Sequence, residues 1–539
     1  MQANMMQLPL LVSSLLRHAE RHHGDQQVVS RGADGELHRY SFRDLARRAR
    51  QLAAALEALG VERGDRVGTL AWNGHRHLEL YYAVSGAGAV LHTLNPRLHA
   101  DQLAWIADHA GDRVLLFDPG LLPLVEALAP SLRGVRHFVL MGDRAQMPAT
   151  SAFGDLLCYE DLIAARDDTY AWPQLDENAA ASLCYTSGTT GEPKGVLYSH
   201  RSTLLHTFGT ALPDTLNLSA RDCVLPVVPM FHVNAWGLPY AACMVGAKLV
   251  LPGPQLDGAS LYALFESEGV TVSAGVPTVW QGLLGHVRER GLRFTSMRRT
   301  IVGGAACPPR MLAEFEDDLD VQVLHAWGMT ELSPIGTVSA PRRHGEPAAH
   351  RRAQQAKQGR CPFGVDMRVV DSAGVELPWD GRSTGELQVR GHWVLQNYFG
   401  GASPLADGWF PTGDVAHIDA EACMQITDRA KDVIKSGGEW IGSIDIENIA
   451  MAHPAVAMAA CIAARHPKWD ERPLLIVVRK PDAELTRAQL LEFFAGRIAR
   501  WWTPDDVIFT ESIPLGATGK MLKHLLRAQY QDHLLCPAN

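Results

Sequence analysis

The sequence lacks closely spaced cysteine pairs and long apolar runs, and only 7% of its residues are aromatic. Its nine cysteines are scattered without a CxxC pair, which argues against a disulfide framework and against a structural zinc site. No window reaches about 18 uninterrupted apolar residues, so no transmembrane span is expected. The apolar residues 8–16 run directly into charged residues without a signal-cleavage pattern and predict a first helix. We therefore expect a cytoplasmic protein with reduced thiols and no integral membrane segment.

An excess of positive charge is also missing. Lys plus Arg total 50 against 59 for Asp plus Glu, a formal net charge of −9, which argues against nucleic acid as a partner. The 539 residues are 47% hydrophobic and 20% charged, as in soluble globular proteins. At about 150 residues per domain, this length suggests two to four structural units.

Helix and strand patterns alternate along most of the chain. Ser41 and Asp44 have the spacing of a capping box, and they precede an apolar helical face that ends at Gly60. Short apolar runs at 67–71, 89–91 and 114–117 predict strands, with a helix over 101–110, and this βαβ rhythm favours an α/β fold. Further strands are expected at 248–251 and 321–324. The runs at 367–370 and 386–389 lie among turns and indicate a β-rich subdomain.

A charged break at 428–432 separates two apolar runs. We place the domain boundary there, with a larger domain at 1–428 and a smaller one at 429–539. In the smaller part the patterns predict helices at 443–451 and around 490–498, strands at 474–478 and 507–510, and a terminal helix after Gly519. The mixture predicts a small α+β domain.

The most informative segment is YTSGTTGEPKG at 185–195. Its glycines allow positive φ and close approach of the backbone to an anion, and four hydroxyl side chains with Lys194 supply donors and positive charge. The spacing differs from the Walker A loop. A flexible hydroxyl-rich surface loop is the alternative, but the length and order of the segment favour phosphate binding.

Together with other motifs, this loop resembles the adenylate-forming superfamily of acyl-CoA synthetases, luciferases and peptide-synthetase adenylation domains. The further motifs follow in the family's order: VGGAA at 302–306, AWGMTE at 326–331, TGD at 412–414, DR at 428–429 and PLGATGK at 514–520. The resemblance covers nearly the whole chain. It implies a large N-terminal AMP-binding domain of two layered α/β subdomains plus a β-rich one, with a small mobile α+β C-terminal domain.

The resemblance implies that a carboxylate attacks the α-phosphorus of ATP, releases pyrophosphate and forms an acyl-adenylate, which is then transferred to coenzyme A. ATP, Mg²⁺ and coenzyme A are the implied cofactors. A hard oxygen pair, Thr186 and Glu331, would contact Mg²⁺, although Glu331 alone could be a helix N-terminal carboxylate. Trp327 would stack on adenine, or is a buried core residue; Asp414 and Arg429 would bind ribose. The implied nucleotide-binding residues are Thr186, Ser187, Gly188, Thr189, Thr190, Lys194, Gly304, Ala305, Ala326, Trp327, Gly328, Met329, Thr330, Asp414 and Arg429.

The C-terminal part of the resemblance implies a moving lid. Lys520 matches the lysine that enters the site during adenylation, so the implied catalytic residues are Lys520, Thr186 and Glu331. Lys431 occupies the hinge position. The residues expected at the hinge and on the coenzyme A side are Lys431, Lys435, Ser436, Gly437, Gly438, Glu439 and Trp440.

Three stretches resemble fatty acyl-CoA ligases: MFHVNAWGLPY at 230–240, IKSGGEWI at 434–441 and HPKWDERP at 466–473. The nearest resemblance is to bacterial medium-chain fatty acyl-CoA ligases, in whose wider family a tryptophan matching Trp236 gates the acyl tunnel. An ordinary packed aromatic is the alternative. The candidate acyl-binding residues are His232, Val233, Trp236, Val276, Gly303 and Cys307.

Other functions stay open at this point. A methylthiopropionate-CoA ligase, another short-chain or aryl acid ligase, or an adenylation domain that loads a carrier protein would share most of these motifs. A luciferase-like oxidase is less favoured, because no luciferin pocket is recognisable in the sequence. A pseudoenzyme would be expected to lose Glu331 or Lys520, and both are present. A homodimer is possible by analogy.

Overall fold

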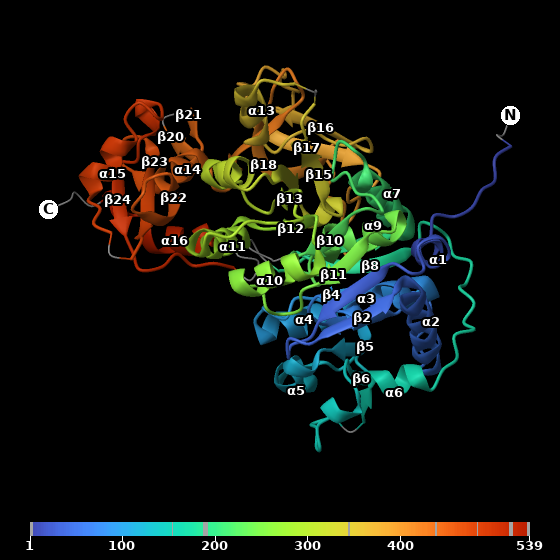
Figure 1. Cartoon of the computed structure of the whole chain (residues 1–539). Helices are drawn as coiled ribbons and strands as arrows, with labels where there is room; N and C mark the ends of the chain where they lie inside the picture. The colour runs from blue at the N-terminus through green and yellow to red at the C-terminus, as the bar shows by residue number, and fades with distance from the viewer. Residues whose placement is uncertain are drawn as a thin grey trace.

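The computed structural model describes residues 4–153, 155–186, 192–342, 345–436, 439–481, 483–516 and 521–535, and for Glu439 and Trp440 the backbone only. Four β-sheets and the helices around them make up this part of the chain (Figure 1). The sheet nearest the C-terminus, formed by strands between Ile434 and Phe509 and called the fourth sheet below, is drawn in red and lies at the opposite end of the molecule from the N-terminus.

The first sheet has seven strands in the order β7-β6-β5-β3-β4-β8-β9, all parallel except the β8–β9 pair. Successive residues of β5 face opposite sides, because side chains alternate along a strand: Val114 and Leu116 join the core against α2 and α3, while Leu115 and Phe117 join the core against α4 and α5. The strands are β3 (Arg66–Leu70), β4 (Val90–Leu94), β5 (Asp112–Phe117), β6 (His137–Leu140), β7 (Leu156–Cys158), β8 (Ala180–Tyr185) and β9 (Gly195–Ser199). The helices of this region are α2 (Phe42–Ala58), α3 (His75–Ala87), α4 (Ala100–Ala110), α5 (Leu122–Leu128) and α6 (Tyr159–Ala164), with the short helices η1 (Pro119–Leu121), η2 (Ala129–Ser131) and η3 (Arg144–Gln146).

The second sheet has eight strands in the order β15-β14-β13-β12-β10-β11-β1-β2, antiparallel only at its two edges. The strands are β1 (Gln27–Arg31), β2 (Leu37–Ser41), β10 (Cys223–Pro226), β11 (Lys248–Leu251), β12 (Val272–Gly275), β13 (Arg299–Val302), β14 (Gln322–Gly328) and β15 (Ile335–Val338). Its helices are α1 (Val12–His22), α7 (His200–Ala211), α8 (Val233–Trp236), α9 (Leu238–Val245), α10 (Gly258–Glu268), α11 (Pro277–Arg290), α12 (Pro309–Ala313) and α13 (Ala348–Gln355), with η4 (Glu314–Asp318) and η5 (Thr330–Leu332).

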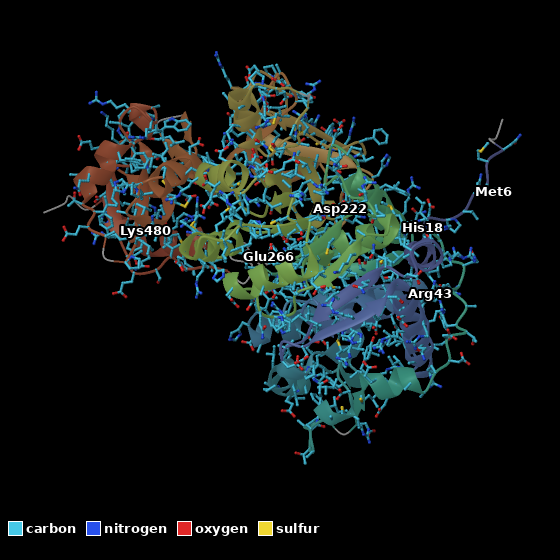
Figure 2. All side chains as sticks on the ribbon, viewed as in Figure 1. Met6, His18, Arg43, Asp222, Glu266 and Lys480 are labelled. Carbon is cyan, nitrogen blue, oxygen red and sulfur yellow. The ribbon has the colours of Figure 1, made fainter. Side chains whose placement is uncertain are left out.

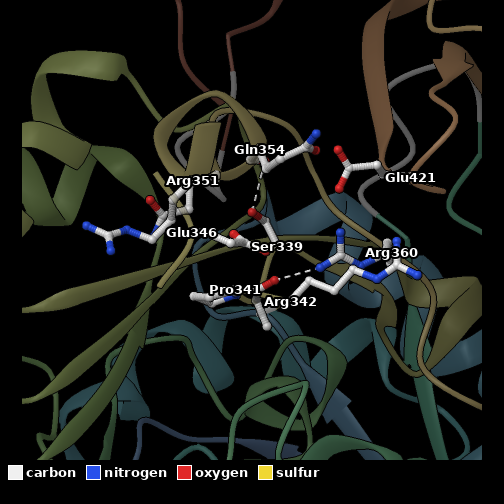
Figure 3. A pocket seen from close by; sticks show the side chains of 10 residues that line it. Ser339, Pro341, Arg342, Glu346, Arg351, Gln354, Arg360 and Glu421 are labelled. Carbon is white, nitrogen blue, oxygen red and sulfur yellow. Dashed lines mark hydrogen bonds between the residues drawn. The ribbon is translucent and has the colours of Figure 1, made fainter. Parts of the chain in front are cut away.

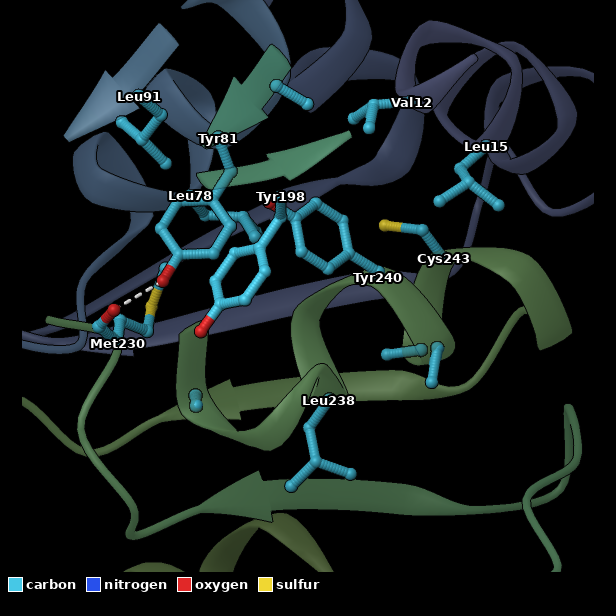
Figure 4. Close-up of a cluster of buried hydrophobic side chains, with 14 of the residues drawn as sticks. Val12, Leu15, Leu78, Tyr81, Leu91, Tyr198, Met230, Leu238, Tyr240 and Cys243 are labelled. Atoms are coloured by element: carbon cyan, nitrogen blue, oxygen red, sulfur yellow. Dashed lines mark hydrogen bonds between the residues drawn. The ribbon is translucent and has the colours of Figure 1, made fainter. Parts of the chain in front are cut away.

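A shared apolar core joins these two sheets. Tyr81 of α3, Tyr198 of β9 and Tyr240 of α9 meet in it, and the Tyr81 hydroxyl donates to the carbonyl oxygen of Met230 (Figure 4). Aromatic side chains contribute much of the area that such a core removes from water. The other face of the second sheet is covered by α10 and α11, where Trp280 is fully buried.

The third and fourth sheets complete the molecule. The third is an antiparallel meander of β16 (Val365–Val370), β17 (Gly385–Gly391), β18 (Phe410–Ile418) and β19 (Met424–Arg429), and its apolar face belongs to the same core as the first two sheets. The fourth sheet contains β20 (Ile434–Ser436), β21 (Glu439–Ile441), β22 (Val456–His466), β23 (Asp470–Arg479) and β24 (Asp506–Phe509). The helices α14 (Ser443–Met451), α15 (Arg487–Phe493) and α16 (Lys523–Tyr530), with η6 (Arg500–Trp502) and η7 (His533–Leu535), belong to this last region.

These elements confirm the predicted α/β fold class with a β-rich and an α+β part. The capping box of Ser41 and Asp44 is present at the start of α2, and the strand at 248–251 and helix at 443–451 have the expected bounds. The first helix begins at Val12, later than the expected start at residue 8. Pro9 favours an extended conformation for Leu8, the residue before it. The preceding segment leaves Met6 90% exposed and away from the body of the molecule (Figure 2).

Two absences concern the described part of the chain only. None of its helices is long and apolar enough to cross a bilayer. Its eight cysteines are free thiols, as expected, and Cys536 lies outside the described residues.

Candidate functional site

A cavity of about 640 Å³ opens at the ends of β12, β13 and β14 of the second sheet, and residues of β18 and β19 of the third sheet also line it. In α/β sheets the carboxyl ends of parallel strands are the usual place for ligands. The predicted site residues that line it are Thr186, Lys194, His232, Val233, Trp236, Val276, Gly303, Gly304, Ala326, Trp327, Gly328, Met329, Thr330, Glu331, Arg429 and Lys431. One cavity thus brings together residues from separate sequence motifs.

The predicted phosphate-binding loop, residues 185–195 and called the phosphate loop below, is closed at its base by hydrogen bonds between Thr186 and Lys194. The backbone N–H of Thr186 donates to the carbonyl oxygen of Lys194 at 2.9 Å, and the N–H of Lys194 donates to the Thr186 hydroxyl at 3.1 Å. These contacts hold both ends of the loop together at the cavity. The loop residues Ser187, Gly188, Thr189 and Thr190 lie outside the described residues.

Trp327, Asp414 and Arg429 form a connected group. The indole N–H of Trp327 donates to Asp414 Oδ2 at 2.9 Å, and Arg429 Nε lies 2.8 Å from Asp414 Oδ1. Asp414 and Arg429 are cross-strand partners on β18 and β19, which explains their contact. Asp414 is only 1% exposed and does not itself line the cavity among the described residues. A carboxylate can accept about four hydrogen bonds, so these contacts do not exclude ribose hydroxyls.

An unusual left-handed turn shapes the apolar wall. Val233, Asn234, Ala235 and Trp236 have φ values of 47°, 50°, 49° and 56°, and Gly237 follows with 76°. Left-handed backbone is costly for residues with a Cβ, and it occurs where the surrounding structure fixes it. Here the buried Asn234 amide donates to the Ser182 hydroxyl at 3.0 Å.

The turn places the Trp236 ring against Gly303. A Cβ added at Gly303 would lie 2.9 Å from the indole, and one at Gly304 would lie 3.1 Å from Val276. Gly303 therefore leaves room for the Trp236 ring, whereas Gly304 leaves room for Val276, since a Cβ at position 304 would lie 4.0 Å from the ring. The wall therefore depends on two glycines from the motif after β13.

Several predicted site residues lie elsewhere. Cys307 does not line the cavity among the described residues; it is buried in the core beneath α11 and α12, and its backbone N–H donates to His325. This corrects its assignment as an acyl wall residue, since the chain turns away from the cavity after Gly304. Ala305 and Ser436 are also absent from the described lining, and the Ser436 hydroxyl instead accepts from Arg472. Lys435 is exposed beside Glu471, to which its N–H donates.

The predicted hinge region reaches the cavity through residues 429–432. Lys431 lines it, and desolvation together with the neighbouring Arg429 lowers the pKa of Lys431 despite the opposing effect of Asp432. Met521 of the C-terminal region lines the cavity as well. Lys520, Gly437 and Gly438 lie outside the described residues, as do the side chains of Glu439 and Trp440.

Some lining residues carry no recognisable signal in the sequence. Tyr398 is the most informative, because its hydroxyl donates to Glu331 Oε1 at 2.9 Å. No motif drew attention to it, since a lone tyrosine after β17 has no distinguishing spacing. Arg97 also lines the cavity, with its guanidinium about 5.5 Å from the centre of the Trp72 ring.

A second, much smaller niche of about 10 Å³ lies between β15 and α13 (Figure 3). Two hydrogen bonds join residues that line it: the Ser339 hydroxyl donates to the Gln354 carbonyl oxygen at 3.0 Å, and Arg360 donates to the carbonyl oxygen of Ala340 at 2.8 Å. That volume suits about one water molecule. We therefore assign the chemistry to the larger cavity.

Comparison with known families and proteins agrees with this geometry. Residues 15–399 match the AMP-binding enzyme family, and residues 445–520 match the AMP-binding enzyme C-terminal domain. The chain is 54% identical to a medium-chain-fatty-acid–CoA ligase of Ectopseudomonas oleovorans, with 99% of this chain and 98% of the relative covered. It is 53% identical to a 3-methylmercaptopropionyl-CoA ligase of Ruegeria lacuscaerulensis, with 99% of this chain and 100% of the relative covered.

Among solved structures, ATP-bound MatB from Rhodopseudomonas palustris superposes with a TM-score of 0.82 at 25% identity, covering 98% of this chain and 100% of that chain. The family matches, the relatives and the motif residues gathered in one cavity all agree. The chain belongs to the AMP-binding enzyme family.

Proposed function

We propose that this protein is an AMP-forming acid–CoA ligase that activates a medium-chain fatty acid. ATP and the acid react to give an acyl-adenylate and pyrophosphate, and coenzyme A then displaces AMP to give the acyl-CoA. The observation that carries the proposal is the division of one cavity. Trp236, Val276 and Val279 supply apolar lining, whereas Lys194 and Glu331 supply charged lining.

This division brings an acyl chain and a nucleotide to one place. The apolar wall gains about 0.8 kcal/mol for each methylene that it buries, so the depth of the wall selects chain length. The positive charge of Lys194 and Arg429 favours a triphosphate and the developing negative charge around its phosphorus. Holding both reactants in one orientation removes much of the entropic barrier to their reaction.

Mg²⁺ fits this site. The Thr186 hydroxyl and the Glu331 carboxylate, which is 7% exposed, both line the cavity and are hard oxygen ligands of the kind that Mg²⁺ prefers. Within the described ranges, no cluster of three or more His, Cys, Asp or Glu side chains is arranged to hold a metal ion. In phosphate-transfer sites Mg²⁺ is held by substrate phosphates and water with one or two protein carboxylates. Such an ion would neutralise phosphate charge.

The C-terminal region completes the mechanism as a lid. We place the domain boundary at 428/429, with the hinge at Lys431 and Lys520 as the lysine delivered to the reacting phosphate. The separate apolar clusters of the fourth sheet, formed by residues from Ile434 onward, support this division. Rotation about the hinge would let Lys520 leave and the thiol of coenzyme A enter.

Purified protein incubated with ATP, Mg²⁺, coenzyme A and a graded series of straight-chain acids tests the function. Mass spectrometry would follow acyl-CoA, with AMP measured in parallel. We expect a maximum of acyl-CoA formation among the medium-chain acids. Absence of AMP with every acid would overturn the proposal.

A 3-methylmercaptopropionate ligase is the second candidate, and the 53% identity to such an enzyme favours it. Including this acid in the series decides between the two by relative kcat/KM. A carrier-protein loading enzyme would produce AMP and acyl-adenylate without acyl-CoA. Replacing coenzyme A with a holo carrier protein identifies that case.

A further inference from the structure

The segment between β17 and β18 contacts both sides of the proposed nucleotide site. The backbone N–H of Leu395 donates to the carbonyl oxygen of Glu331 at 2.8 Å. Four residues later, the N–H of Phe399 donates to the carbonyl oxygen of Gly195, also at 2.8 Å. Residues 395–399 therefore link Gly195, at the end of the phosphate loop, to Glu331, the candidate magnesium ligand, through two backbone hydrogen bonds.

Tyr398 repeats this link with its side chain. Its hydroxyl donates to Glu331 Oε1 at 2.9 Å, and the Nζ of Lys194 lies 4.9 Å from the centre of its ring. The hydroxyl is the donor in this contact, because an ionised carboxylate can only accept. The side chain is half-buried and lines the cavity.

Each contact has a distinct physical effect. A charge-assisted hydrogen bond to one carboxylate oxygen fixes the rotation of the carboxylate. Residues that hydrogen-bond metal-ligating carboxylates commonly change metal affinity by about 10- to 100-fold when they are removed. The ring attracts the Lys194 ammonium through its quadrupole, an interaction that stays intact when only the hydroxyl is deleted.

We propose that Tyr398 is a positioning residue for magnesium-bound ATP, in which the hydroxyl orients Glu331 and the ring holds Lys194 on the same side of the cavity. This inference rests on the proposed function, because it takes Glu331 as the carboxylate that contacts the ion. The inference assigns different roles to the hydroxyl and to the ring of Tyr398. Removing the hydroxyl should affect the dependence on Mg²⁺, and removing the ring should affect binding of the triphosphate itself.

The test measures ATP binding by calorimetry without acid or coenzyme A, so no reaction takes place. Wild type, Tyr398→Phe and Tyr398→Ala are titrated with ATP over a range of Mg²⁺ concentrations and in EDTA. Tyr262→Phe is the matched control, because it also deletes a hydroxyl that donates to a protein oxygen, the Arg293 carbonyl at 2.9 Å, and Tyr262 is not among the described residues that line the cavity. Melting temperatures and circular dichroism establish that each variant is folded.

For Tyr398→Phe we expect the Mg²⁺ concentration at half-maximal ATP binding to rise about 10-fold, with binding in EDTA unchanged. Tyr398→Ala should show the same rise and also weaker binding in EDTA, because Lys194 loses its ring. In a Glu331→Gln background, Tyr398→Phe should cause no further shift, since its hydroxyl acts through the carboxylate.

Three results would overturn the inference. The first is a Tyr398→Phe protein with the Mg²⁺ dependence of wild type, and the second is a shift that persists in the Glu331→Gln background. The third is wild-type protein that binds no ATP under any condition, which would overturn the proposed function together with it. The first two leave the proposed function standing, so the two failures are distinguishable.

Discussion

The nucleotide side of the cavity and the C-terminal region are held in place by different kinds of contact. Trp327 and Leu332 belong to an apolar core that also includes Ala416 and Ile418 of β18, the strand that carries Asp414. The C-terminal region instead has apolar clusters of its own, and in the part of the chain that the structure describes they contain no residue before Ile434. The nucleotide side of the cavity resists displacement, because moving β14 and β18 apart would expose their shared apolar core to water.

Polar contacts join the C-terminal region to the rest at β19. The N–H of Ser443, at the start of α14, donates to Asp428 Oδ2 at 2.6 Å. A Cβ added at Gly442 would lie 2.8 Å from the carbonyl oxygen of Thr427, so the two backbones approach closely there. Polar groups that separate can bond to water instead, so this seam can open without exposing a shared core. This difference supports the proposal that the nucleotide side stays in place while the C-terminal region moves as a lid.

Replacing Lys520 is expected to have the largest effect on activity, and it distinguishes the proposed lid from the nucleotide side of the cavity. We expect Lys520→Ala to reduce acyl-adenylate formation by about 100- to 1,000-fold, because in the proposed mechanism this lysine stabilises charge on the reacting phosphate. Thioester formation from preformed acyl-adenylate should persist. Measuring pyrophosphate release and acyl-CoA formation separately, with Lys480→Ala as a surface control, tests this. Survival of both half reactions would show that Lys520 does not act in the lid.

Proline at Lys431 tests whether the lid must turn. Lys431→Pro should fix φ near −65° and lower overall turnover by at least about 10-fold while one half reaction is retained. Lys431→Ala keeps the backbone free and separates loss of the side chain from loss of rotation. Equal turnover in the proline variant and wild type would contradict a hinge at this residue.

Deleting the Trp327 indole N–H tests the fixed surface. Trp327→Phe leaves Asp414 buried with one donor fewer, and a hydrogen bond to a charged group contributes about 1.5–3 kcal/mol. We expect KM for ATP to rise about 10-fold, with KM for the acid unchanged. Trp379→Phe, at a tryptophan that is 38% exposed, is the control. A rise in both KM values would show a general loss of structure at the cavity rather than a specific loss at the nucleotide.

The sequence predicted most of this division, because motif residues carry distinctive types and spacing. Most of the predicted site residues between Thr186 and Arg429 that the structure describes line the cavity, and the α/β layers and the separate C-terminal pattern could also be predicted. It could not predict the left-handed turn at Val233, because the turn contains no glycine before Gly237 and depends on contacts such as Asn234 to Ser182. Tyr398 was missed for a related reason: its role depends on two partners far away in sequence.

The smallest expected effect concerns a carboxyl group at the seam itself. Burial, together with the nearby Asp428, raises the pKa of Asp445 to about 6, although Asp445 lies in the first turn of α14, where a negative charge is normally favoured. The ordinary value for this group is 3.8. The folded protein therefore binds more protons than the unfolded chain between about pH 4 and pH 6, and its stability falls as pH rises through that window.

Asp445→Asn removes this titration. Relative to wild type, the variant should gain stability between about pH 4 and pH 6 and keep a gain of about 1–2 kcal/mol above that range, less than the shift alone would give because the helix terminus favours the charged form. Amide hydrogen exchange in α14, corrected for intrinsic rates, measures the local free energy of opening at each pH. Asp214→Asn, at an exposed aspartate, is the control. A difference from wild type that stays constant across this pH range would show that Asp445 does not resist ionisation at the seam.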